Sequence, residues 1–331
     1  MAENTDVYET LADMYDQEDV VGGPKTEAFL KTLKLYFTRT EAKLALEIRF
    51  QGGTLAQLAE KTGMDTVKLK AKLMAMADKG TIFYDSSDDP VYKVVGMAAP
   101  GLIETGLWCN IKFPFSVELA KTMHTFLKEW AEQTLCKLGM PFAPVWAGLK
   151  ALPPDAAPEE NIAEAIKNEG HWSVSPCPCR LSHWLVDPGN HCSHIMETCL
   201  HTGELSKWAV RHGMARKLSF DEVITFLEDC NEDGLVQTLN IQNCICNCCD
   251  DCCAIFHGQK LGTQVFIPSP FVALSDDQAC NGCGICAKRC PVDAVTVEGE
   301  TATVNAELCL GCGACVPSCK EAAMKLSRRA A

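Results

Sequence analysis

Eight cysteines near the C-terminal end of the chain form two sets with the same internal spacing, and they limit the possible folds more than any other feature. Both sets follow the pattern C-x2-C-x2-C-x3-C, and the second begins 29 residues after the first. The two sets are Cys280, Cys283, Cys286 and Cys290, then Cys309, Cys312, Cys315 and Cys319. A [4Fe–4S] cubane needs one thiolate at each iron corner, and soft sulfur suits iron better than oxygen or nitrogen does. The tandem sets therefore predict a pair of cubanes.

Residues 268–328 closely resemble the bacterial-type two-cluster ferredoxin, in which the fourth cysteine of each run ligates the other cluster. The resemblance implies that one [4Fe–4S] cluster is held by Cys280, Cys283, Cys286 and Cys319. It implies that the second [4Fe–4S] cluster is held by Cys309, Cys312, Cys315 and Cys290. Zinc is the alternative metal, but zinc sites usually use C-x2-C pairs that lie far apart. Pro291 follows the first set as in the family, whereas Lys320 replaces that proline in the second.

Residues around the two cysteine sets agree with a small domain that wraps closely around clusters. Gly282, Gly284, Gly311 and Gly313 allow backbone conformations that a side chain would hinder. The stretches 295–297 and 301–304 alternate around Gly299 and predict a short hairpin. The stretches 271–274 and 324–326 predict the outer strands of the same domain.

The cysteine count and the N-terminal sequence bear on the compartment. The chain has 331 residues and 21 cysteines. Secreted disulfide scaffolds are also rich in cysteine, but they are short and begin with a signal peptide. The first twenty residues here are acidic and lack an apolar core. No run reaches the roughly 20 apolar residues that span a bilayer. We expect a cytoplasmic protein of an anaerobe, because exposed cubanes are sensitive to oxygen.

The formal charge of −13 indicates the kind of partner. An acidic chain repels nucleic acid and favours a basic docking surface on another protein. The sequence contains no G-x-G-x-x-G fingerprint after a strand, so it shows no nucleotide site of its own. We therefore expect redox protein partners that bind flavin or nucleotide, and no DNA. The sequence makes no prediction of the oligomeric state.

Residues 1–105 predict an acidic arm, 1–23, followed by a winged-helix-like domain. Helical periodicity at 26–50, a short helix at 55–61 and a longer one at 65–79 precede strands at 81–84 and 91–95. This order resembles a winged helix-turn-helix, whose longer helix would enter the major groove. Residues 1–105 carry 12 basic and 17 acidic side chains, and the turn of the hairpin holds Asp85, Asp88 and Asp89. We expect this domain to contact protein rather than DNA.

Residues 106–170 predict a helical segment at 116–137 and an extended, proline-rich linker at 141–158. A short helix at 159–167 follows. Apolar residues in the first helix recur at helical spacing and indicate a core face.

Residues 171–265 contain ten clustered cysteines, and we expect a mainly helical iron–sulfur module there. They are Cys177, Cys179, Cys192, Cys199, Cys244, Cys246, Cys248, Cys249, Cys252 and Cys253. Prolines should keep Cys177 and Cys179 extended, with both side chains on one side. Cys192 and Cys199 would share a helical face. Ten thiols fit two cubanes, one cubane with structural cysteines, a larger cluster or a zinc–thiolate site.

Other polar residues of this module are not expected to be metal ligands. Thiolates compete well for iron, so His171, His183, His191, His194 and His201 are expected to be structural. Arg180 follows the C-x-C pair and is expected either to donate hydrogen bonds to cluster sulfur or to form a surface ion pair.

The whole order resembles a family of anaerobic iron–sulfur proteins of unsettled function. That family runs from a winged helix through a C-x-C-R motif and an I-C-N-C-C block to a two-cluster ferredoxin. Asp250 and Asp251 depart from its pattern inside the block. The fold class expected is therefore α+β multidomain, with domains at 1–105, 106–170, 171–265 and 266–331.

Three functions remain open at the level of sequence. The first is an electron-transfer protein that relays electrons between cytoplasmic redox partners through two [4Fe–4S] clusters and one or two more. The second is a cluster-based redox-sensing transcription regulator. The third is an iron–sulfur subunit of an oxidoreductase complex. The first is favoured, and little activity is expected from the chain alone.

Overall fold

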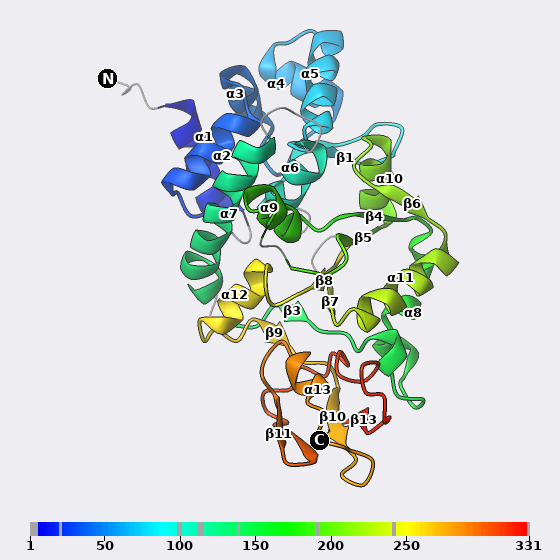
Figure 1. The fold of residues 1–331 in the computed structure, drawn as a ribbon. Helices are drawn as coiled ribbons and strands as arrows, with labels where there is room; N and C mark the ends of the chain where they lie inside the picture. The colour runs from blue at the N-terminus through cyan, green and yellow to red at the C-terminus, as the bar shows by residue number, and fades with distance from the viewer. Residues whose placement is uncertain are drawn as a thin grey trace.

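The computed structural model describes residues 6–19, 22–97, 101–110, 116–137, 140–189, 192–239 and 243–329. Figure 1 shows three parts, with the N-terminal helices at the top, a twisted sheet in the middle and the C-terminal part at the bottom. The helices and strands of the first part are α1 Val7–Glu18, α2 Glu27–Tyr36, α3 Arg39–Ile48, α4 Leu55–Thr62, α5 Thr66–Asp78, β1 Ile82–Tyr84, β2 Tyr92–Val94, α6 Leu102–Asn110 and α7 Ser116–Gln133.

Local capping explains how the N-terminal helices are divided. Thr38 and Glu41 form a capping box that starts α3, so the helical periodicity predicted over 26–50 belongs to two helices, α2 and α3. Gly63 ends α4 in the left-handed conformation. The predicted order of a short helix, a longer helix and a hairpin is present as α4, α5, β1 and β2. The winged-helix resemblance itself stays a prediction.

The predicted loose arm at 1–23 is wrong for the residues described. Helix α1 buries Leu11, Ala12 and Tyr15 completely. The Tyr15 hydroxyl also donates to the carbonyl of Val95, 80 residues away. The acidic residues that suggested an arm lie on the outer face of this helix, while its apolar residues recur at helical spacing.

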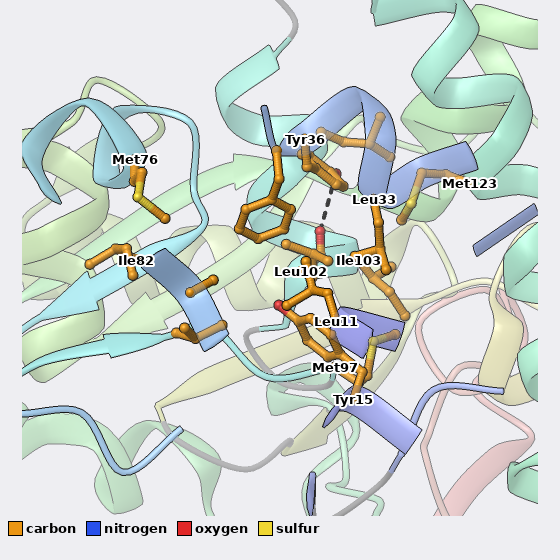
Figure 2. Packing of buried hydrophobic residues seen from close by; sticks show 14 of the residues in the cluster. Leu11, Tyr15, Leu33, Tyr36, Met76, Ile82, Met97, Leu102, Ile103 and Met123 are labelled. Atoms are coloured by element: carbon orange, nitrogen blue, oxygen red, sulfur yellow. Dashed lines mark hydrogen bonds between the residues drawn. The ribbon is translucent and has the colours of Figure 1, made fainter. Parts of the chain in front are cut away.

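Helices α6 and α7 bind the N-terminal helices to the rest of the molecule. Figure 2 shows the packing of buried side chains around Leu33, Tyr36 and Ile103, and the bond from the Tyr36 hydroxyl to the Leu102 carbonyl at 3.1 Å. Gly106 lies against the Tyr36 ring, where a Cβ atom would overlap it. The close approach of α2 to α6 therefore requires glycine at 106.

A five-stranded antiparallel sheet forms the middle of the molecule, in the order β6-β4-β5-β8-β7. Its strands are β4 Trp172–Pro176, β5 Glu197–Thr202, β6 Arg216–Leu218, β7 Val236–Leu239 and β8 Cys244–Cys248. Helices α8 Ile162–Ile166, α9 Pro178–Val186, α10 Gly203–Arg211, α11 Phe220–Glu232 and α12 Ala254–Lys260 surround it. The prediction of a mainly helical module therefore missed the sheet around which these helices are arranged. The capping box of Ser219 and Glu222 does start α11 as predicted.

Two local predictions for this part are wrong. Cys199 lies in strand β5 and Cys192 in the irregular segment before it, so the two share no helical face. Cys177 is the N-cap of α9 and Cys179 lies inside that helix, so the pair is not extended. Pro178 occupies the first helical position, where its missing N–H leaves no bond unmade.

The proline-rich segment after residue 140 is packed into the structure, contrary to the extended linker predicted. Strand β3, Ala143–Pro144, pairs in parallel with β9, Phe266–Ile267. The Trp146 N–H then donates to Gln237 of the central sheet, and the Gly148 N–H donates to Cys312 of the C-terminal part. Four short 3₁₀ turns flank this region, at Leu135–Lys137, Leu149–Ala151, Pro158–Glu160 and Lys167–Glu169.

The C-terminal part has the strands predicted from the sequence. Strand β10, Phe271–Ser275, pairs with β13, Met324–Arg328, and β11, Val295–Glu298, forms a hairpin with β12, Thr301–Val304. The short helix α13, Ile285–Lys288, follows the first cysteine loop. The predicted domain boundaries remain predictions, because the three parts share extensive contacts.

We expect Gly106→Ala to lower the free energy of unfolding by about 2 kcal/mol, since overpacking a filled core forces side chains and backbone to move. The matched control is Gly258→Ala in α12, where a Cβ atom would meet only ordinary contacts, the nearest at 3.4 Å. Alanine is favoured over glycine inside a helix, so the control should not be destabilised. Thermal or denaturant unfolding followed by circular dichroism measures both, and equal stabilities would contradict the packing described.

Candidate metal centres

The C-terminal cysteines gather into two groups of four, each drawing members from both sequence sets. One small cavity is lined by the first three cysteines of the first set and the last of the second, namely Cys280, Cys283, Cys286 and Cys319. This is the first group of four that the ferredoxin resemblance implies.

The second group lies against the central part of the molecule. Burial, together with the nearby thiols of Cys290 and Cys309, raises the pKa of Cys312 to about 12. Burial also raises the pKa of Cys315, which the thiols of Cys312, Cys309 and Cys290 face. The thiol of Cys290 from the first sequence set thus lies near those of Cys309, Cys312 and Cys315 from the second. Neutral thiols are favoured there unless a cation offsets their charge, as a metal does.

Glycine at two positions lets the cysteine loops approach neighbouring backbone. Gly282 has φ +70°, and a Cβ atom there would overlap the carbonyl oxygen of Gly299 in the β11–β12 turn. Gly311 has φ +66°, and its Cβ atom would overlap the Phe271 carbonyl at the start of β10. Each cysteine loop is therefore pressed onto a strand or turn, which fixes where its sulfurs lie.

The ten cysteines of the central part gather in one region, although they come from distant segments. These cysteines lie at the N-terminus of α9, in the segment before β5, in strands β5 and β8 and in the turn before α12. A cavity of about 70 Å³ among apolar side chains is lined by seven of them, which are Cys177, Cys179, Cys199, Cys246, Cys248, Cys249 and Cys253.

Direct sulfur contacts run through this group. The Sγ atoms of Cys248 and Cys253 lie 3.4 Å apart, and those of Cys192 and Cys252 lie 3.6 Å apart. The ligand atoms of Cys192, Cys249 and Cys252 all lie within 4.8 Å of one another. Cys230, which is not one of the ten clustered cysteines, is buried against Cys249 and Cys252. Its place in α11, far from the other cysteines in sequence, gave no signal of this.

Arg180 lies inside the group and is 1% exposed. Its guanidinium donates to the carbonyls of Ile195 and Asn247, and to the Thr198 hydroxyl at 2.7 Å. The described residues provide it with no carboxylate within ion-pair distance, so the predicted surface salt bridge is wrong. Burial acts to lower the pKa of Arg180, but the thiols of Cys177 and Cys249 raise it overall. A buried cation without a carboxylate favours thiolates around it.

The remaining electrostatics fit that arrangement. The Cys252 thiol and Arg180 lower the pKa of Cys249 to about 5, against the effect of burial. Hydrogen bonds from the thiols of Cys199 and Cys246 lower the pKa of Cys244 to about 6. Glu104 of α6 also lines the cavity, and burial raises its pKa to about 7. The sequence carried no sign of Glu104 at this site, because it lies 73 residues before Cys177.

The histidines expected to be structural have different surroundings. His194 lies 3.1 Å from an Asp233 oxygen, as a structural histidine would. His183 stacks edge-on against His124, with ring centroids 4.3 Å apart, beside Cys252 and Cys253. His201 is fully buried beside Cys199 and Cys244. His171 is half-buried, and His191 lies outside the described residues.

Cys312 of the second C-terminal group packs into the same hydrophobic cluster as two of the central cysteines. Cys248, Cys253 and Leu310 are buried together there, with Cys312 packed against them. The Asn231 side chain of α11 donates to the Gly313 carbonyl at 3.5 Å. The two sulfur-rich regions are therefore in direct packing contact.

A family model described as a 4Fe-4S dicluster domain matches residues 273–320, which include all eight C-terminal cysteines. No curated protein and no solved structure matches the chain. Among the described residues, none of the helices is both long and apolar enough to cross a membrane. The match supports a C-terminal ferredoxin-like domain, and together with the cysteine groups it indicates iron–sulfur electron transfer.

We expect Gly282→Ala to remove about four irons per chain, because the added Cβ atom pushes the first cysteine loop off the Gly299 carbonyl. Gly284→Ala is a matched control in the same loop, since its φ is +75° but no atom lies within 4 Å of the added Cβ. It should cost only the roughly 1 kcal/mol of a left-handed residue and keep its iron. Iron and acid-labile sulfide counts distinguish the two. Full iron in Gly282→Ala would show that the loop needs no such contact.

Proposed function

We propose that this protein is an iron–sulfur electron carrier that relays electrons between redox proteins through two C-terminal [4Fe–4S] clusters and at least one further cluster in its central part. The observation that carries the proposal is the packing of Cys312 against Cys248 and Cys253. It joins the group of four around Cys312 to a second region where seven cysteines line one cavity. A chain of neighbouring sulfur sites is what a relay requires.

The ligands of the C-terminal pair are proposed to be exchanged between the two sequence sets. Cys319 completes the cluster of Cys280, Cys283 and Cys286, with which it lines one cavity. Cys290 completes the cluster of Cys309, Cys312 and Cys315. Cys283 is exposed, whereas Cys312 and Cys315 are largely enclosed, so the first cluster is placed to meet a partner and the second to pass electrons inward.

The central part is proposed to bind a cluster through the thiols around its cavity. Buried thiols in contact repel each other once ionised, and a metal removes that cost by binding the thiolates. The guanidinium of Arg180 lies beside the same thiols, where it can donate a hydrogen bond to Cys249 and where its positive charge favours thiolates. Hydrogen bonds and positive charge near cluster sulfur raise the reduction potential of a cluster. The central cluster would therefore accept electrons from the neighbouring C-terminal cluster.

The alternative of a DNA-binding regulator is disfavoured by contacts within the chain. The turn between β1 and β2 would be the wing, yet both the N–H and the hydroxyl of Ser86 donate to Glu204 of α10, at 2.8 and 2.9 Å. His212 lies 2.6 Å from Asp78 and 3.1 Å from the Tyr84 hydroxyl. We propose that the hairpin supports the central part, and that an acidic outer surface docks partners that bind flavin or nucleotide.

We expect Cys319→Ala to remove or convert one cluster while leaving the other intact, with a loss of up to four irons per chain. The cluster affected should be the one also lost in Cys283→Ala, because both residues line the same cavity. Electron paramagnetic resonance of the reduced variants identifies the missing signal. If Cys319→Ala instead matched Cys309→Ala, the ligands would not be exchanged.

We expect Arg180→Met to lose the central cluster, about four irons, and to keep about eight irons in the C-terminal pair. Methionine fills a similar volume but leaves the thiolates without their buried cation. Arg180→Lys keeps the charge without the planar donor geometry, and should retain an intermediate amount. Arg216→Gln is the control, because Arg216 is exposed and, among the described residues, forms an ion pair with Glu197 at 3.2 Å. An unchanged iron count in Arg180→Met would contradict the role given to this residue.

A further inference from the structure

Strands β5 and β8 place three cysteines and one histidine on the same face of the central sheet. In the antiparallel register, His201 lies directly opposite Cys244, and Cys199 lies opposite Cys246. Side chains two residues apart on a strand point to the same face. Directly opposite residues bring their Cβ atoms to about 5 Å. The four side chains therefore form a square whose corners are fixed by the backbone ladder.

The distances among Cys199, Cys244 and His201 suit one metal ion, and Cys246 lies beside two of these residues. The Sγ atoms of Cys199 and Cys244 lie 3.5 Å apart, and the ligand atoms of Cys199, Cys244 and His201 all lie within 4.8 Å of one another. The Cys246 thiol contacts both other thiols. For a metal–sulfur distance of about 2.3 Å, tetrahedral geometry separates two sulfurs by about 3.8 Å. A cubane instead takes each thiolate at a different iron and would have to spread residues that the β5–β8 ladder holds together.

His201 supplies an independent observation. Its side chain is completely buried, and its Nε2 atom has no hydrogen-bond partner among the described residues. Its Nδ1 atom lies 3.5 Å from the buried Ser173 hydroxyl of β4. The Trp108 ring covers the imidazole, with the two ring centroids 4.4 Å apart. A proton on Nδ1 that is shared with Ser173 leaves the Nε2 lone pair free. Histidine ligands in metal sites commonly bond through their other nitrogen in this way.

We propose that Cys199, Cys244, Cys246 and His201 bind a single zinc ion as a closed, structural site. Three thiolates and one imidazole are a common ligand set for structural zinc. The ion would pin β5 to β8 along their shared ladder, next to Cys248, whose thiol also contacts Cys246. The remaining thiols at the cavity, Cys177, Cys179, Cys248, Cys249 and Cys253, are sufficient for the further cluster. The inference does not depend on the iron–sulfur assignment, since zinc and iron are counted separately.

The test measures zinc, iron and sulfide in full-length protein purified without oxygen from cells grown with both metals. Wild type should contain about one zinc per chain in addition to its iron. His201→Ala should lose most of that zinc and keep its iron and sulfide. His201→Cys should retain the zinc, because a fourth thiolate replaces the imidazole. His171→Ala is the control at the edge of the same sheet and should match wild type.

Cobalt substitution gives a second readout that a purely structural histidine would not change. Co²⁺ bound in place of zinc should show the intense visible bands of a tetrahedral thiolate site, shifted in His201→Cys relative to wild type. Zinc-free wild type overturns the proposal, whether or not its iron is present. So does a loss of iron together with zinc in His201→Ala, since that outcome makes His201 a ligand or support of the cluster. Absence of iron with zinc retained would overturn the proposed function and leave this site standing.

Discussion

The guanidinium of Arg180 joins the three segments that carry the central cysteines. It belongs to α9, whose N-cap is Cys177, and it donates to the Ile195 carbonyl before β5 and the Asn247 carbonyl within β8. A buried cation is costly unless hydrogen bonds and negative charge surround it. Carbonyls and a hydroxyl provide the bonds, and the thiolates provide the charge. Arg180 favours ionisation of Cys249, whose pKa it lowers, so a bound metal that kept the neighbouring thiols ionised would also stabilise the meeting of these segments.

The C-terminal part is held against the centre by close packing rather than by a flexible tether. A Cβ atom at Gly148 would overlap the Asn231 side chain, and one at Gly313 would overlap Ala151. The Gly148 N–H also donates to the Cys312 carbonyl at 3.0 Å. Such contacts leave little freedom for the two parts to separate. Electron transfer between neighbouring clusters benefits from a fixed, short separation, and the segment that looked like a linker provides it.

The predictable parts of the structure were those whose chemistry is local. The C-terminal strands and cysteine loops follow from short repeats, and the start of α11 follows from the Ser219 capping box. The central sheet did not follow, because Cys199 pairs with Cys246 across 46 intervening residues and no local pattern encodes that register. Spacing alone also misplaced Cys192 and Cys199, since a separation of seven fits a helix while the β-branched Thr198 and Thr202 favour a strand. Glu104 and Cys230 reach the site only through tertiary packing.

The N-terminal part has a structural role, because it packs against the part of the molecule that carries the central cysteines. Its hairpin meets α10 through Ser86 and Tyr84, and α10 directly follows β5, the strand of Cys199 and His201. The Trp108 ring of α6 covers His201, and its indole N–H donates to the Pro176 carbonyl beside Cys177 at 3.0 Å. The helices above the sheet thus exclude water from one face of the cysteine-rich centre. Exclusion of water strengthens every charge interaction there, so the N-terminal part contributes to how tightly the thiolates and Arg180 hold together.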